Sequence, residues 1–217
     1  MISTCLGQSA DMTEGVYTDL KTGINFSTWT NQDGFTTGLV LPPDAAGQNA
    51  ADYIGLLRCE SDTANATGWC GLAHHGDMLA DLLLIAWQYQ GSVVTSFRWA
   101  TDYFMPPAYV GQDVSLTQIS SWANATGYEV IYQCRNCLSP KTQPAAVAKS
   151  ANASKTSLPL GYAQGFDSPL NPGCPGNVTF TFHDKGYGQW EASLESTEAA
   201  LYDQWALLAT KVQNDTC

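Results

Sequence analysis

Hydrophobic and polar residues alternate over short segments of this chain, and residues that favour turns separate the segments. Strands are predicted where the alternation or the apolar run is clearest, at 24–29 (INFSTW), 35–41 (FTTGLVL), 52–58 (DYIGLLR), 92–100 (SVVTSFRWA), 128–134 (YEVIYQC), 158–164 and 177–183 (NVTFTFH). Period-two segments of this length, bounded by Gly, Pro and Asn, are typical of an antiparallel all-β protein.

The stretch from Gly71 to Trp87 (GLAHHGDMLADLLLIAW) is the most distinctive part of the chain. Its second half, 79–87, is almost entirely apolar, and Asp81 is its only charge. A run this short predicts a strand that is buried on both faces, and the tight turn at 89–91 predicts a hairpin with the next strand. The first half is predicted to be a turn that carries three candidate metal ligands: His74, His75 and Met78.

The hydrophobic pattern predicts a helix only in the C-terminal part of the chain. Apolar residues recur there at helical spacing, at Leu201, Trp205, Leu208 and Val212, with Ser196 as a candidate N-cap and Lys211 in the last turn. About ten short strands followed by one helix indicate an all-β sandwich. Residues 139–176 form a long proline-rich connection that does not divide the chain, so we expect a single domain over 1–217 with its core at about 23–212.

Composition and charge limit the classes of partner. Nowhere are there eighteen consecutive apolar residues, so no transmembrane helix is expected. The formal charge of −11, from 20 acidic and 9 basic residues, disfavours nucleic acid and anionic membranes, because both require a basic face. The first fifteen residues do not read as a signal peptide. Either a signal peptide has been removed or the protein is intracellular.

Sequons and cysteines favour secretion. The pattern Asn-x-Ser/Thr occurs at Asn25, Asn65, Asn124, Asn152, Asn177 and Asn214. Chance predicts about two such sites, so a glycosylated extracellular chain is indicated. Among the seven cysteines, the pairs Cys59/Cys70 and Cys134/Cys137 are close enough in sequence for local disulfides. Cys5, Cys174 and Cys217 remain, and the odd total leaves one thiol free or paired outside the chain.

Several common sites are excluded by the motifs. The chain contains no GxSxG elbow, no glycine-rich phosphate loop and no HExxH zinc motif. Leu138 follows the CxxC of Cys134 and Cys137 where covalent haem attachment needs histidine, so the motif is not such an attachment site. The pair is either redox-active or a local structural disulfide, and a secreted chain favours the disulfide. His183 ends a predicted strand, and Met78 precedes one. A sandwich can bring two such loops together at one end.

Four segments of the chain resemble one known family. They are GLAHHGDMLADLLLIAW (71–87), FRWATDYFMPPAY (97–109), YQCRNC (132–137) and FTFHD (180–184). In this order they resemble the haem-binding cytochrome domain of fungal cellobiose dehydrogenase and its iron-reductase-domain relatives, from about Gly23 to the C-terminal helix. The motifs M-x-x-D-L-L-L-[IV]-A-W and R-W-A-T-x-Y are the specific ones, and the CxxC agrees with them.

The resemblance implies an immunoglobulin-like sandwich that binds one non-covalent haem b. It implies that Met78 and His183 are the axial ligands of the iron, that Tyr103 lies by a haem propionate, and that Cys134 and Cys137 are bridged. His74 and His75 depart from the family pattern, which has an apolar residue and a small residue there. Either histidine could compete for the iron.

The implied function is single-electron transfer. Met and His ligation fills both axial positions, so such a haem moves electrons and does not activate oxygen. The resemblance implies a flavin or quinone dehydrogenase domain as donor, and a parent chain that acts as a cellobiose or other sugar dehydrogenase. It implies a copper-dependent polysaccharide monooxygenase as acceptor, with ferric iron or quinones as alternatives. We expect a secreted monomer that turns over no substrate of its own. The alternative is a haem-free sandwich module that binds carbohydrate on an aromatic platform.

Overall fold

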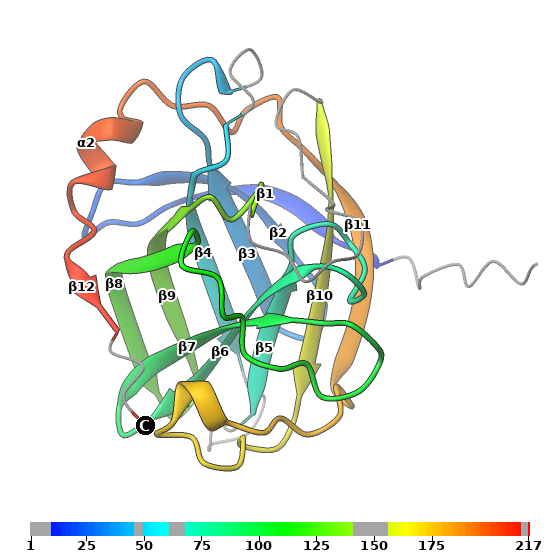
Figure 1. Cartoon of the computed structure of the whole chain (residues 1–217). Helices are drawn as coiled ribbons and strands as arrows, with labels where there is room; N and C mark the ends of the chain where they lie inside the picture. The colour runs from blue at the N-terminus through cyan, green and yellow to red at the C-terminus, as the bar shows by residue number, and fades with distance from the viewer. Residues whose placement is uncertain (1–9, 46–49, 61–67, 141–155, 214–216) are drawn as a thin grey trace, which may run out of the picture.

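The computed structural model describes residues 10–45, 50–60, 68–140, 156–213 and 217. Two antiparallel sheets pack face to face as a sandwich (Figure 1). The larger sheet has seven strands in the order β1-β2-β3-β4-β9-β8-β12. Their bounds are Thr13–Thr18, Asn25–Thr30, Phe35–Val40, Tyr53–Glu60, Gly127–Arg135, Ser115–Asn124 and Lys211–Val212 in that order.

The smaller sheet has five strands in the order β11-β10-β5-β6-β7. Their bounds are Gly186–Ser193, Ser157–Gly165, Trp69–Ala73, Leu82–Tyr89 and Ser92–Trp99 in that order. The strands β6 and β7 form the predicted hairpin, with Leu82 opposite Trp99 and Tyr89 opposite Ser92. The prediction of an immunoglobulin-like, antiparallel all-β sandwich with a short C-terminal helix is therefore confirmed.

The main core lies between the two sheets, as the alternation along the strands predicts. One residue in two on β4, β5, β6, β9 and β10 faces this core, and the disulfide between Cys59 of β4 and Cys70 of β5 crosses it. The hydroxyl of Tyr128 also bridges the sheets, by donating a hydrogen bond to the carbonyl oxygen of Ala86 (2.9 Å). A second cluster covers the outer face of the larger sheet, where Tyr202 of the helix α2 (Tyr202–Ala206) packs.

The segment 177–183 is not a strand, contrary to the prediction. A short 3₁₀ helix, η1 (Pro175–Asn177), precedes it, and only Thr179 makes an isolated bridge, to Leu170. The alternating side chains of this segment pack onto the outer face of the smaller sheet, so its periodicity comes from that packing and not from a ladder of hydrogen bonds.

The C-terminal helix is shorter than predicted, because neighbouring backbone groups take other partners. Leu41, the residue after β3, exchanges backbone hydrogen bonds with Thr197 and Ala199, so these two groups do not join a helical ladder. Lys211 and Val212 form β12 beside β8 and are not helical. The strands β1, β5, β8 and β11 were not predicted, and β1 precedes the predicted start of the core at residue 23.

Three disulfides lie in the described residues. Cys59–Cys70 and Cys134–Cys137 agree with the expected local pairs, and Cys174 pairs with Cys217. This leaves Cys5, which lies outside the described residues, as the seventh cysteine. In the part of the chain that the structure describes, no helix is long and apolar enough to cross a membrane.

Candidate cofactor site

The outer face of the smaller sheet has small residues at its centre. Gly71 of β5 lies between Ala163 of β10 and Ile85 of β6, and one row further along, Ala73 lies between Gly161 and Leu83. These residues alternate with core residues such as Cys70 and Leu72, so their side chains point away from the interior. A flat surface of small side chains is what a planar apolar cofactor needs, and the sequence pattern alone did not reveal it.

Met78 lies at one end of this surface. It belongs to the connection 74–81 between β5 and β6, and it packs against Ala73, Leu83 and Ala100. The connection folds closely over the sheet: Gly76 has φ of +85°, and a Cβ built on Gly161 would lie 2.4 Å from the carbonyl oxygen of Gly76. Met78 is partly exposed, so its thioether is available to a ligand on this surface.

His183 lies on a segment that crosses the other end of the same surface, residues 178–184, which we call the strap. Val178 packs with Trp69, Ile85 and Trp87, and the ring of Phe180 lies 5.4 Å from each of the two Trp rings. Trp69 and Ala73 are four residues apart on β5, so the two ends are separated by about 13 Å along the strand. The row that contains Gly71 lies between them.

The His183 imidazole is half-buried among aromatic rings. Its centroid is 4.1 Å from the ring of Phe182 and 4.4 Å from the ring of Tyr187, and its Nδ1 is buried with no hydrogen-bond partner in the described residues. Burial lowers the pKa of His183. A neutral imidazole has a free nitrogen lone pair, so this side chain suits metal ligation.

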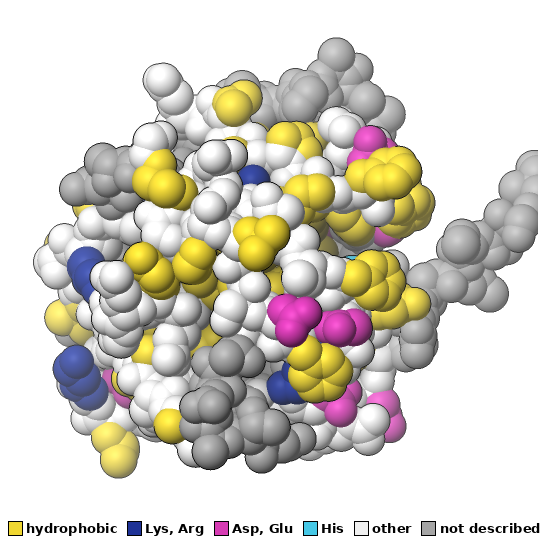
Figure 2. Space-filling view, turned by 90° about the horizontal axis from the view of Figure 1, so that it is seen from below, with side chains coloured by type: hydrophobic (Ala, Val, Ile, Leu, Met, Phe, Trp, Pro, Cys, Tyr) yellow, Lys and Arg dark blue, Asp and Glu magenta, His cyan; other side chains and the backbone are white. Residues whose placement is uncertain are grey.

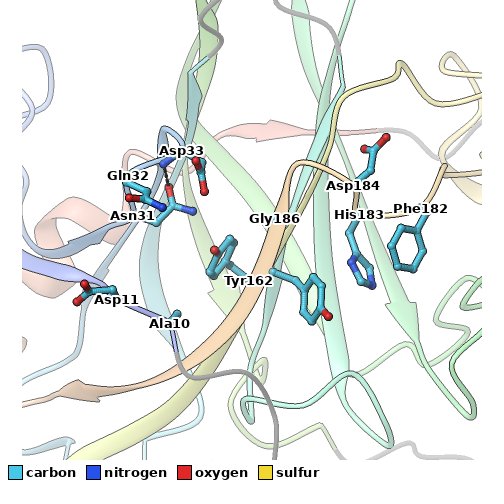
Figure 3. Close-up of a pocket in the computed structure, with 11 residues that line it drawn as sticks. Ala10, Asp11, Asn31, Gln32, Asp33, Tyr162, Phe182, His183, Asp184 and Gly186 are labelled. Atoms are coloured by element: carbon cyan, nitrogen blue, oxygen red, sulfur yellow. Dashed lines mark hydrogen bonds between the residues drawn. The ribbon is translucent and has the colours of Figure 1, made fainter.

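A cavity of about 410 Å³ opens beside His183. Figure 3 shows His183 and Phe182 on one side of it, and Asn31, Gln32 and Asp33 from the β2–β3 turn on the other side. Its lining does not include Met78 or Tyr103. The cavity therefore borders the His183 end of the surface, while Met78 approaches from the other end.

The loop that carries Tyr103 contacts the strap. Met105 of this loop accepts a hydrogen bond through its Sδ from the backbone N–H of Phe180 (3.5 Å). The side chain of Tyr103 itself is 65% exposed. The structure thus brings Met105, two residues after Tyr103, against the strap.

Arg98 of β7 contacts the residues just before the strap and the strap itself. Its guanidinium is 3% exposed and donates hydrogen bonds to the carbonyl oxygen of Pro175 (2.6 Å) and to the Oγ of Ser96 (3.1 Å). It also lies over the ring of Phe180, 5.4 Å from the centroid. The R-W-A-T-x-Y motif contains Arg98, but the sequence alone assigns this residue no role.

His74 is not available to a metal. It is fully buried, its Nδ1–H donates to the carbonyl oxygen of Leu82 (2.6 Å), and its Nε2 accepts a hydrogen bond from the hydroxyl of Tyr53 (2.8 Å). Burial lowers the pKa of His74, so the ring is neutral and both of its nitrogens are used within the protein. The expectation that His74 could compete for the iron is therefore wrong.

His75 is held by Asp81. The Nδ1–H of His75 donates to one carboxylate oxygen of Asp81 (2.6 Å), and the backbone N–H of His75 donates to the other (2.8 Å). The Asp81 side chain is completely buried. The isolated charge of Asp81 in an apolar run was the sequence signal for this contact, although its partner could not be read from the sequence.

Exposed aromatic and acidic side chains surround the site. Large hydrophobic residues with more than a third of their surface exposed include Tyr103, Phe104, Met105, Phe166, Phe182 and Tyr187. Asp102, Asp167 and Asp184 are also exposed. Figure 2 shows acidic side chains next to hydrophobic ones at one side of the lower face of the molecule.

Known proteins resemble this chain in sequence and in fold. The family described as the cytochrome domain of cellobiose dehydrogenase matches residues 17–204. The cytochrome domain of Myriococcum thermophilum cellobiose dehydrogenase is 39% identical, with a TM-score of 0.85, and covers 92% of this chain and 97% of its own. The cytochrome b domain of pyranose dehydrogenase from Coprinopsis cinerea is 26% identical, with a TM-score of 0.74 and the same coverage.

One relative is much longer than this chain. A pyrroloquinoline quinone-dependent pyranose dehydrogenase of Coprinopsis cinerea is 32% identical over 120 residues, which are 55% of this chain and 16% of the relative. The fold and these matches define the class as a β-sandwich cytochrome domain of the kind found in sugar dehydrogenases. The chain belongs to the family of the cytochrome domain of cellobiose dehydrogenase, and this family implies haem binding.

Proposed function

We propose that this chain binds one non-covalent haem b between Met78 and His183 and transfers single electrons. The observation that carries the proposal is that both residues flank the same row of small residues, although they are 105 positions apart in the sequence. The disulfide between Cys134 and Cys137 uses both cysteines of the CxxC motif, so neither is free for a covalent bond to haem.

The donor set fits the cofactor. Met78 and His183 would hold the haem iron through a thioether and an imidazole, and a haem held by these two residues would supply one-electron exchange and would not activate oxygen. Partial burial lowers the pKa of His183, which favours the neutral imidazole that a metal binds, and the rings of Phe182 and Tyr187 lie beside it. Gly71 and Ala163 leave room against the sheet, and Tyr103 would donate a hydrogen bond to a haem propionate.

The partners follow from the same reading. Relatives of this chain are domains of cellobiose and pyranose dehydrogenases, so the donor is a dehydrogenase domain that carries a flavin or a quinone, in the same parent chain or in another. The acceptor is a copper-dependent polysaccharide monooxygenase. Exposed acidic residues at the rim, such as Asp102 and Asp184, favour a partner surface with basic residues.

The protein is proposed to be a secreted, glycosylated monomer. Three of the sequons lie in the described residues, and their asparagines, Asn25, Asn124 and Asn177, are all exposed. Three disulfides agree with an oxidising compartment. The alternative of a haem-free carbohydrate-binding module gives way to the cytochrome reading, because the family implies a haem.

Spectroscopy of the purified protein tests this proposal. The haem-loaded protein should show a low-spin spectrum with resolved α and β bands after reduction, and acidified acetone should extract the haem. Met78→Ala and His183→Ala should each lose tight haem binding or the low-spin state. Met105→Ala, which removes another thioether at the rim, is the matched control and should keep the parent spectrum. Unchanged low-spin spectra in both ligand variants would show that the ligand assignment is wrong.

A further inference from the structure

The connection that carries Met78 is fastened to the protein on both sides of that residue. On one side, His74 reaches across the sandwich to the hydroxyl of Tyr53 in the larger sheet. In the same sheet, the hydroxyl of Tyr132 lies 3.3 Å from that of Tyr53. On the other side the backbone N–H of Ala80 donates to the carbonyl oxygen of Ala100 (2.8 Å). These contacts fix the two ends of the connection.

His75 and Asp81 close the connection into a ring, and we call this pair the clamp. Two hydrogen bonds of 2.6 and 2.8 Å join His75 to the two carboxylate oxygens of Asp81. The side chain of His75 is 5% exposed and that of Asp81 is 0% exposed. Hydrogen bonds to a buried carboxylate are stronger than neutral ones and have no water to compete with them, so the clamp restricts the five residues between its members.

We propose that the clamp of His75 and Asp81 is a positioning device that presents the Met78 thioether to the haem iron. The inference rests on the proposed ligation by Met78. A thioether is a weak donor to ferric iron, so it remains bound only if the protein holds it close to the metal. Outer contacts that orient a ligand typically change metal affinity 10–100-fold, and the clamp is such a contact.

The clamp also keeps His75 away from the iron. With Nδ1 bound to Asp81, the ring of His75 is fixed in the interior, and its Nε2 is buried without a hydrogen-bond partner in the described residues. Without Asp81, the released imidazole becomes a competing ligand only a few residues from Met78. Loss of the clamp therefore lowers the reduction potential whether Met78 leaves the iron or His75 replaces it, because thioether ligation raises the potential.

Three substitutions on this connection test the proposal. Asp81→Ala removes the clamp, and Asp81→Asn keeps an oxygen that can accept from the backbone N–H of His75. Asp77→Asn removes a carboxylate next to Met78 that has no hydrogen bond within the described part of the chain, so it controls for charge alone. For each variant, the haem dissociation constant, the reduction potential and the ferric methionine-to-iron charge-transfer band are measured, together with thermal unfolding of the haem-free protein.

Asp81→Ala should weaken haem binding roughly tenfold or more. It should also lose the charge-transfer band and shift the potential to more negative values. Asp81→Asn should retain most of the band, and Asp77→Asn should retain all of it. If Asp81→Ala lowers only the unfolding temperature and leaves the band and the potential unchanged, the clamp has a purely structural role and the proposal is overturned.

The Met78→Ala variant separates this inference from the proposed function. If Met78→Ala has the parent charge-transfer band, Met78 is not the ligand and the proposed ligation itself fails. If Met78→Ala loses the band while Asp81→Ala keeps it, the ligation stands and only the positioning role of the clamp is refuted.

Discussion

Replacing Arg98 with alanine should loosen the strap that carries His183. The guanidinium makes its two shortest hydrogen bonds to the carbonyl oxygen of Pro175 and the Oγ of Ser96, and two longer contacts of 3.4 and 3.5 Å contribute little. The Oγ of Ser96 also donates to the carbonyl oxygen of Pro175 (3.0 Å), so both groups keep a partner in the variant. The loss is that of two hydrogen bonds from a charged donor, about 3–6 kcal/mol, and losing the contact with the ring of Phe180 adds about 1–2 kcal/mol.

Part of that loss is offset, because the variant no longer has to bury a positive charge. We therefore expect Arg98→Ala to lower the free energy of unfolding by about 3 kcal/mol. For a domain of this size, with a urea m-value of about 2–3 kcal/mol/M, the midpoint should fall by about 1–1.5 M. Haem affinity should fall as well, because the segment from Pro175 to His183 is held by the same guanidinium.

Urea denaturation followed by tryptophan fluorescence, and haem titration followed by absorption, measure the two effects. Arg98→Lys should recover only part of the stability, since an ammonium cannot reach Pro175 and Ser96 in the same planar geometry. Arg135→Ala removes an exposed guanidinium and should change the unfolding free energy by less than about 0.5 kcal/mol. An Arg98→Ala midpoint within about 0.3 M of the parent, with unchanged haem affinity, would refute this account of the strap.

Two further predictions concern the sandwich and the Met78 connection. Replacing both Cys59 and Cys70 with alanine removes the disulfide between the sheets and should lower the free energy of unfolding by about 2–5 kcal/mol, measured by urea denaturation against the parent. An unchanged midpoint would show that the disulfide contributes no stability. Gly161→Ala places a Cβ against the carbonyl oxygen of Gly76, so the connection that carries Met78 must move. The free energy of unfolding should fall by about 1–3 kcal/mol, and the methionine-to-iron charge-transfer band should weaken. A parent-like spectrum would mean that this close approach does not position Met78.

The sequence predicted most of the strands whose pattern is local. The hairpin of β6 and β7 follows from an apolar run, a tight turn and a second alternating run, all within about twenty residues. It did not predict β11, whose glycines at 186 and 188 weaken the pattern; this strand pairs with β10 through a register that only the folded sheet provides. In the strap the error was the opposite: a strand was predicted where none forms, because the alternation of apolar residues there reflects packing on the sheet.

The candidate site divides in the same way. Met78, His183 and Tyr103 could be named from the sequence because their motifs resemble a family, and Met78 and His183 are residue types suited to an axial ligand. How these residues are arranged in space could not be predicted from the sequence. The arrangement depends on the contact of the strap with Trp69 and Trp87, which are about a hundred positions away.

The roles of the two neighbouring histidines show most clearly what each level decides. The sequence determined that His74 and His75 stand beside Met78 with nitrogen atoms able to bind a metal. Only the tertiary structure decided that they do something else, because it buries His74 against Tyr53 of the other sheet and His75 against Asp81. A side chain's chemistry is fixed by its type, but the partner that uses this chemistry is fixed by the fold, since burial leaves each polar group to satisfy its hydrogen bonds with the nearest available atom.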